Sequence, residues 1–221
     1  MSFGKKTVFN SRLFLTFLLA ALVLGGFNFV GNARADMSTG LVGYWAFNEG
    51  SGTSAADSSG NGNTGAITSG TWSASGKIGS ALDFNGTTSK VNAGSAAVLD
   101  NLANFTYSAW VNPRTLGESI FAGIIVEKAG GLGFKKLTLS DSSGNQFYGD
   151  VEMSGETTIA SSNVNELQFN IWTHIVLVYN DTNKTASLYK NGSLIAAGVG
   201  AVHKIIFNNS KFIINNGNVV I

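Results

Sequence analysis

The sequence predicts an all-β protein: an antiparallel two-sheet sandwich, preceded by an N-terminal hydrophobic signal helix. Short apolar runs recur along the chain, and Asn, Gly, Ser and Thr residues separate them. No stretch after residue 36 keeps a sustained helical periodicity. The 221 residues include 28 glycines and a single proline, which is typical of many short strands joined by tight turns. This length is sufficient for one domain and a targeting segment.

The composition excludes several classes of protein. Only 12% of the residues are charged and 44% are hydrophobic, which excludes a long disordered chain. The chain has no cysteine, so it has neither disulfides nor a thiolate metal site. Four of the 14 basic residues and none of the 13 acidic ones lie in residues 1–35. Residues 36–221 therefore carry a net charge of −3, which argues against nucleic acid as a partner.

The N-terminal segment has the layout of a secretory signal. Lys5, Lys6 and Arg12 precede an almost wholly apolar stretch over residues 13–30, and an Ala-x-Ala pattern ends at Ala35. We predict a signal peptide over residues 1–35 that is cleaved before Asp36. The alternative is an uncleaved anchor, since 18 residues barely span a bilayer. Either outcome places residues 36–221 outside the cytoplasm, as a secreted or cell-surface domain.

The apolar runs give the expected strands in order. They cover residues 42–47, 81–84, 90–92, 105–111, 120–128, 134–139, 146–153, 157–161, 172–179, 185–190, 193–197 and 211–214. One short helix is expected over residues 95–102, with Ser95 as its cap. Asn85-Gly86 and Ser143-Gly144-Asn145 are expected to form turns.

The sharpest local signal is Asn191-Gly192. Both residue types tolerate the positive φ of a type I′ turn, so residues 185–190 and 193–197 should pair as a hairpin. The run at 172–179 should add the third strand of a meander. Apolar residues occupy both of its faces, which predicts a central strand that is covered on both sides.

Several segments, taken in order, resemble the laminin-G-like jelly roll of the concanavalin A-like lectin/glucanase superfamily. They are residues 41–52, 57–63, 79–86, 105–113, 172–176 and 189–192. The resemblance implies a jelly-roll sandwich over residues 36–221. Members of this family usually end in a further strand of acidic, basic and aromatic residues. The sequence up to Ile221 has no such run, so we expect the domain to lack this closing strand.

The loop 57–63 is a candidate Ca²⁺ site. Asp57, Asn61 and Asn63 supply side-chain oxygens at short spacing, and calcium takes six to eight oxygen ligands. The resemblance implies that such a loop contributes to a calcium site together with partners from the closing strand. The alternative is a tight Asx-turn, because Asp, Asn and Gly dominate turns for local reasons. The similar run 141–145 is expected to be a plain hairpin turn.

The acidic residues indicate that the domain is not an enzyme. Related glucanases carry Glu-x-Asp-x-Glu on one strand, whereas here Asp150 and Glu152 are followed only by a displaced Glu156. We expect Asp150 and Glu152 to be exposed strand residues. His174 lies in an apolar run and is expected to be buried or half-buried in the core.

The tryptophans suggest one ligand contact. Trp45, Trp110 and Trp172 fall in expected strands, so we predict that they pack in the core. Trp72 lies in a Gly/Ser/Thr-rich stretch and is predicted to be an exposed loop residue that contacts the ligand.

These observations predict an exported, non-catalytic binding or adhesion module. Carbohydrate is the ligand class implied by the resemblance, and the partner is a glycan or an extracellular protein. Two alternatives stay open: a glycoside hydrolase of the glucanase type, and a structural module of a larger cell-surface protein with no small ligand.

Overall fold

The computed structural model divides the chain into two units, Met1–Thr39 and Gly40–Ile221. It describes residues 39–96, 98–99, 102–115, 121–129, 133–140, 145–153, 156–163, 165–199, 201–202, 211–214 and 219–220. The predicted signal peptide over residues 1–35 and the predicted turn at 141–144 lie outside the described residues. No helix within the described part of the chain has the length and apolar character needed to cross a membrane.

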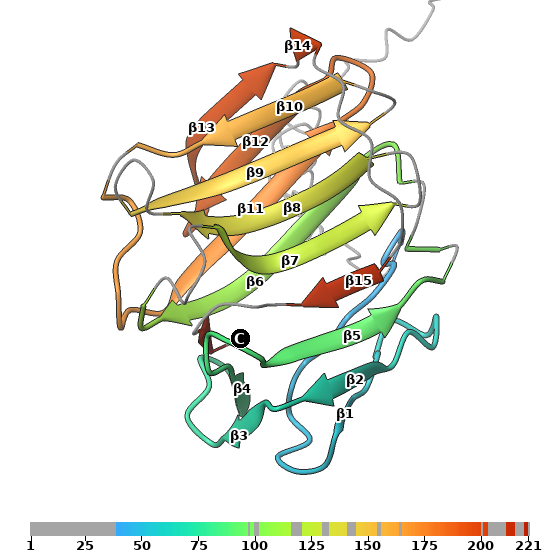
Figure 1. Ribbon diagram of the computed structural model, residues 1–221, viewed down its shortest axis with the longest axis vertical. Coiled ribbons are helices and arrows are strands. Elements are labelled where there is room, and N and C mark those ends of the chain that lie inside the picture. The colour runs from blue at the N-terminus through green and yellow to red at the C-terminus, as the bar shows by residue number, and fades with distance from the viewer. Residues whose placement is uncertain are drawn as a thin grey trace, which may run out of the picture. The chain divides into compact units, whose positions relative to one another are not determined.

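The described strands form two antiparallel sheets, which confirms the predicted all-β class (Figure 1). The nine-stranded sheet has the order β1-β2-β5-β15-β7-β8-β9-β10-β14. Its strands are β1 (Ser54–Ala55), β2 (Gly65–Thr68), β5 (Lys90–Gly94), β7 (Phe121–Ala129), β8 (Gly133–Ser140), β9 (Gln146–Met153), β10 (Glu156–Ser161), β14 (Ala201–Val202) and β15 (Lys211–Ile214). The seven-stranded sheet has the order β13-β12-β11-β6-β16-β4-β3. Its strands are β3 (Thr71–Ser73), β4 (Ala81–Asp83), β6 (Phe105–Pro113), β11 (Thr173–Asn180), β12 (Thr185–Lys190), β13 (Ser193–Val199) and β16 (Val219–Val220).

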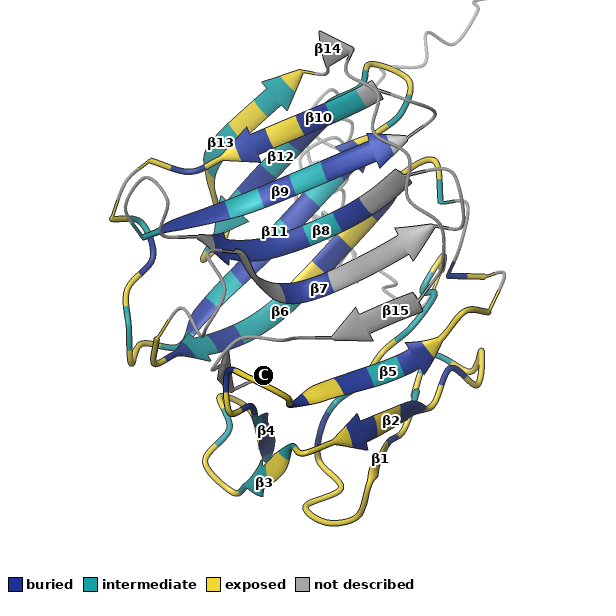
Figure 2. Cartoon of the chain, viewed as in Figure 1, coloured by how far each residue is buried: buried dark blue, intermediate teal, exposed yellow. Residues whose placement is uncertain are grey.

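The two sheets pack face to face around one apolar core. Side chains alternate between the core and the outer face along most of β6 and β11, as Figure 2 shows. On β11, Ile175 and Leu177 are fully buried, whereas Val176 and Val178 on the outer face are half-buried. Strand β11 lies between β6 and β12, so the predicted central strand is confirmed.

The predicted meander is also confirmed. Strand β11 pairs with β12, and β12 pairs with β13 across the Asn191-Gly192 turn. Asn191 has a φ of 49° and Gly192 a φ of 83°, so both central residues occupy the left-handed region that a type I′ turn requires. The turn therefore fixes the position of Asn191 at the end of the hairpin.

Two local predictions were wrong. The described residues of 95–102 contain a turn at Val98-Leu99 and no helix. There the Leu99 amide donates to the carbonyl oxygen of Ala96 at 2.8 Å, and burial of the Leu99 side chain favours the turn. Residues 42–47 form no continuous strand, only a single bridge between Trp45 and Asp57. Phe47 has a φ of 52°, which ends an extended backbone at that point.

Two short segments near the C-terminal end pair inside the sheets. Strand β15 lies between β5 and β7, as expected for residues 211–214, and β16 lies between β4 and β6. Strands β1, β2 and β3 were not predicted because they are two to four residues long and rich in Gly, Ser and Thr.

Candidate functional site

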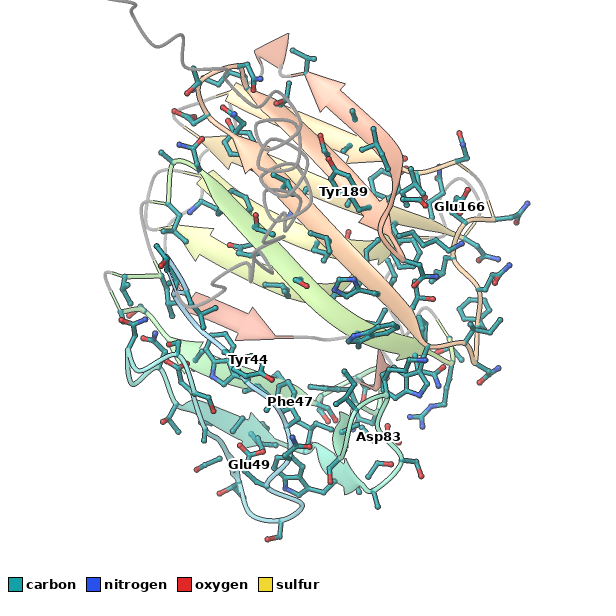
Figure 3. All side chains as sticks on the ribbon, turned by 180° about the vertical axis from the view of Figure 1, so that it is seen from behind. Tyr44, Phe47, Glu49, Asp83, Glu166 and Tyr189 are labelled. Carbon is teal, nitrogen blue, oxygen red and sulfur yellow. The ribbon has the colours of Figure 1, made fainter. Side chains whose placement is uncertain are left out.

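An open hollow of about 370 Å³ lies beside the start of β11 and the Asn191-Gly192 turn. Two tryptophans, a histidine, a lysine and an asparagine line it: Lys77, Trp110, Trp172, His174 and Asn191. Figure 3 views the seven-stranded sheet, which carries part of this hollow, from its outer side. The volume falls within the range of small-molecule sites.

Strand register brings the central pair together. Trp110 on β6 is the direct partner of His174 on β11, although 64 residues separate them in the chain. Their neighbours Val111 and Ile175 are buried in the core, so Trp110 and His174 occupy outward positions. The prediction that Trp110 and Trp172 pack in the core was wrong, because both are half-buried and line the hollow.

The aromatic rings of the hollow are held by side-chain contacts. The Trp110 and His174 rings lie 5.1 Å apart between centroids at an interplanar angle of 34°. His174 Nε2 shares a hydrogen bond of 2.8 Å with the Ser108 hydroxyl, which fixes the ring. Burial lowers the pKa of His174 below its usual value, which favours the neutral form of the ring. His174 is half-buried, as predicted, but it lies on the outer face of β11 and not in the core.

Two loops supply the polar groups. Lys77, from the β3–β4 connection, places its Nζ atom 5.1 Å from the centroid of the Trp110 ring, a cation–π distance. Asn191 accepts the His174 backbone N–H with its Oδ1 atom at 2.9 Å. The hollow thus combines aromatic faces with an exposed cation and a side-chain amide.

A second, smaller hollow of about 80 Å³ lies on the nine-stranded sheet and is lined by Lys136, Thr138, Tyr148 and Asp150. The prediction that Asp150 and Glu152 are exposed was wrong. Glu152 is 4% exposed, and the Asp150 side chain is 25% exposed. Neighbouring strands β8 and β10 cover these carboxylates on both sides, which sequence alone did not indicate.

Asp150 is held in an unfavourable environment for a charge. Burial raises its pKa to about 6, the Lys136 ammonium at 3.8 Å partly opposes this, and Glu152 adds to it. The Oδ1 atom is buried and accepts no hydrogen bond from the described residues. A carboxylate with these properties is costly to ionise and holds its proton well above the usual pH.

This environment predicts a pH-dependent stability. The folded state retains the Asp150 proton between about pH 4, where an unfolded Asp titrates, and about pH 6. The free energy of unfolding should therefore fall by about 1–2 kcal/mol as the pH rises through this window, after allowance for the exposed quarter of the side chain. Asp150→Asn should remove this decline in urea denaturation at pH 4, 5, 6 and 7.

Asp181→Asn provides the matched control for this experiment. The Lys184 ammonium donates a hydrogen bond to Asp181 and lowers the pKa of its carboxyl, which places its titration below the window. Asp181→Asn should keep the decline between pH 4 and pH 6. An equal slope in the wild type and Asp150→Asn would contradict the assignment.

The loop 57–63 forms a hydrogen-bonded anchor for the preceding segment. The Asp57 carboxylate accepts the backbone N–H groups of Tyr44, Ser59 and Asn63 at 2.8 to 3.0 Å. Burial alone would raise the Asp57 pKa, but these hydrogen bonds and one with the Ser59 hydroxyl outweigh it and lower the pKa to about 2. The side-chain amides of Asn61 and Asn63 both donate to the Val42 carbonyl.

These contacts describe an Asx-turn, with both carboxylate oxygens engaged by amides. The described residues contain no group of three or more His, Cys, Asp or Glu side chains arranged to hold a metal ion. Calcium binding by Asp57, Asn61 and Asn63 stays a prediction.

Trp72 lies in strand β3 and not in a loop, so that part of its prediction was wrong. Its indole is half-buried, packs against the core and donates from Nε1 to the Gly52 carbonyl at 2.9 Å. Trp45 packs against the core, as predicted, and donates from Nε1 to the Asn63 carbonyl at 2.8 Å. A role for Trp72 in ligand contact stays a prediction.

Two antiparallel sheets with a shared apolar core define the chain as a β-sandwich protein of the jelly-roll type. The sequence model of the concanavalin A-like lectin/glucanases superfamily matches residues 85–219, more than half of the chain. The chain belongs to this superfamily. A search of the curated proteins finds no match.

Several solved structures are similar to the chain, and the arabinanase domain below shares its fold. Domain 4 of AbnA, a GH43 extracellular arabinanase from Geobacillus stearothermophilus in complex with arabinotriose, is 19% identical with a TM-score of 0.52. The match covers 74% of this chain and 82% of that chain. Trypanosoma rangeli sialidase in complex with sialic acid matches 78% of this chain and 28% of its own, at 16% identity and a TM-score of 0.48. The carbohydrate-binding module CBM66 from Bacillus subtilis matches 71% of this chain and 89% of its own, at 14% identity and a TM-score of 0.37.

Proposed function

We propose that the chain is an exported, non-catalytic module that binds a glycan in the hollow between Trp110, Trp172 and His174. Membership of a superfamily of lectins and glucanases supports carbohydrate as the ligand class. The arabinanase domain with the same fold was solved in complex with arabinotriose, which also supports this class.

The observation that carries the proposal is the pairing of aromatic faces with polar groups in one open hollow. Sugar rings have an apolar C–H face that stacks on aromatic side chains, while their hydroxyls need hydrogen-bond partners. Trp110 and Trp172 supply the aromatic surface, and Lys77 and Asn191 supply donors at its rim. Polar groups placed beside aromatic side chains are typical of small-ligand sites.

The N-terminal sequence supports export. The basic residues, the apolar stretch over 13–30 and the Ala-x-Ala pattern match the order of a secretory signal. Export would place the hollow where extracellular glycans are available, either in secreted form or at the cell surface.

Glycoside hydrolysis is the second candidate, and one observation favours it. Asp150 has a pKa raised to about 6 and neighbours the buried Glu152, and a glycosidase needs an acid that holds its proton together with a second carboxylate. Two features oppose it. The Asp150 hollow of about 80 Å³ is far below the usual size of a ligand site. Glu156, the third acid of the sequence, lies on the neighbouring strand opposite Met153.

Calcium is a separate proposal for the loop of Asp57, Asn61 and Asn63. An ion there would have to compete with the three backbone amides that Asp57 now accepts. The loop would then act by stiffening the segment that precedes it, and glycan binding in the Trp110 hollow would not depend on the ion.

Binding to a panel of immobilised neutral and acidic glycans tests the proposed function. The purified chain should bind at least one class, equally in calcium and in EDTA, and should release no reducing ends from it. Loss of binding in EDTA would show that an ion is required. Reducing ends that disappear in Glu152→Gln would support the hydrolase. No binding by a folded sample would support the structural-module alternative.

A further inference from the structure

We infer that the hollow of Trp110, Trp172 and His174 selects an acidic saccharide, one whose sugar carries a carboxylate or sulfate, with Lys77 as the specificity-determining residue. This inference rests on the proposed function, and it adds the chemical class of the ligand.

The first argument for an acidic ligand is the charge of the side chains that line the hollow. Of the described residues that line the hollow, Lys77 is the one lysine or arginine and none is an acid, while burial lowers the pKa of His174 and disfavours a second positive charge there. No described carboxylate forms an ion pair with Lys77. Its Nζ atom lies over the Trp110 ring, 5.1 Å from the ring centroid. Among the described residues the Lys77 ammonium therefore has no carboxylate partner, and it is placed at the aromatic surface of the hollow.

The second argument is that the side-chain amide of Asn191 offers a hydrogen-bond donor to the ligand. The backbone N–H of His174 can only donate, so the Asn191 atom that it contacts at 2.9 Å must be the amide oxygen. The Nδ2 group is then left as a donor at the edge of the hollow. With Lys77 and Asn191 both donating, the rim offers donors and no carboxylate acceptor, which suits an acceptor-rich anionic group better than neutral hydroxyls.

The backbone around Lys77 is held in place. In the connection between β3 and β4, the Gly76 amide donates to the Gly79 carbonyl at 3.0 Å, and the Ser80 amide donates to Asn48 Oδ1 at 2.9 Å. Gly79 has a φ of 70°, and a Cβ there would overlap the Asn48 side chain, so this turn requires glycine. A fixed turn reduces the entropy lost when Lys77 engages a ligand.

The test compares matched glycans that differ in charge. Trigalacturonic acid and its methyl ester differ only in the carboxylates, and κ-carrageenan and its desulfated form differ only in the sulfate groups. At low salt, the wild-type chain should bind the acidic member of one pair about tenfold or more tightly than its neutral partner. The pair that shows the difference identifies carboxylate or sulfate as the recognised group.

The variants test whether Lys77 is responsible. Lys77→Met should reduce the preference to about twofold or less, whereas Lys77→Arg should retain it. Lys90→Met is the matched control, since Lys90 is an exposed lysine on β5 of the other sheet, and it should leave the preference unchanged.

The possible results show separately whether the acidic-ligand inference fails or the proposed glycan binding fails. Equal binding of acidic and neutral members overturns the acidic-ligand inference and leaves glycan binding intact. An equal loss of preference in Lys77→Met and Lys90→Met also overturns it, because the net charge would then be the cause. No binding to any glycan overturns the proposed function and the inference together.

Discussion

Replacing Trp110 with alanine is expected to weaken glycan binding at least 30-fold and to leave the fold intact. Trp110 provides the ring that both His174 and Lys77 contact, at 5.1 Å in each case, so its removal takes away the stacking surface and frees the lysine. Loss of a central aromatic anchor typically costs about 2 kcal/mol or more, which corresponds to about 30-fold in affinity. Isothermal titration with the best glycan of the panel measures the change.

The fold should tolerate this change because the Trp110 side chain lies on the outer face of β6, between the buried Val111 and the half-buried Ala109. Trp72→Ala is the informative comparison. Trp72 packs against the core and donates to Gly52, so its loss should lower the melting temperature and change affinity less than twofold. If Trp72→Ala lost binding and Trp110→Ala kept it, the ligand contact would be Trp72, as the sequence predicted, and not Trp110.

Local sequence signals were sufficient to predict much of the seven-stranded sheet. Asn191-Gly192 specifies its turn through two residues that tolerate positive φ, and the strands on either side follow from it. The apolar residues on both faces of residues 172–179 likewise predicted a central strand. These features depend on residues that are close in sequence, which is why they could be predicted without tertiary information.

The aromatic hollow required information that the sequence did not supply directly. The alternation that places Tyr107 and Val111 in the core also places Trp110 on the outer face, and the same parity on β11 places His174 there. The alternation in the sequence could therefore have predicted that both side chains face outward. It could not predict the strand register that places Trp110 opposite His174, or the loop conformation that places Lys77 over the Trp110 ring.

Burial of polar residues was the least predictable property. Two acidic residues, Asp150 and Glu152, suggest a strand at the protein surface. Strand β9, which carries them, is instead an interior strand between β8 and β10, and both side chains are largely shielded from solvent. The prediction for Trp72 was wrong in the same direction, because its indole is half-buried and not exposed. Its Gly, Ser and Thr neighbours suggest a loop, whereas pairing with Leu82 on β4 makes a three-residue strand. Both cases depend on which strands become neighbours.

The second large effect is expected where the two sheets meet, at Gly149 of β9 and Leu177 of β11. A Cβ at Gly149 would overlap the Leu177 side chain, so Gly149→Ala should destabilise by about 2 kcal/mol through overpacking. Leu177 is fully buried, and Leu177→Ala should cost about 3 kcal/mol through the cavity that it leaves. In the double variant the new methyl group enters that cavity, so the two losses should fall short of additive by about 1 kcal/mol or more.

Urea denaturation of the wild type, the two single variants and the double variant measures this coupling. Gly149→Ala combined with Leu82→Ala, a fully buried leucine on β4, is the control and should be additive within about 0.5 kcal/mol. Additive losses of unfolding free energy for Gly149→Ala and Leu177→Ala would mean that these two positions on β9 and β11 do not contact each other. The contact bears on binding as well as on stability, because Leu177 and His174 share strand β11. Packing of Leu177 on the core face of β11 therefore supports the position of His174 on the outer face, where it lines the hollow.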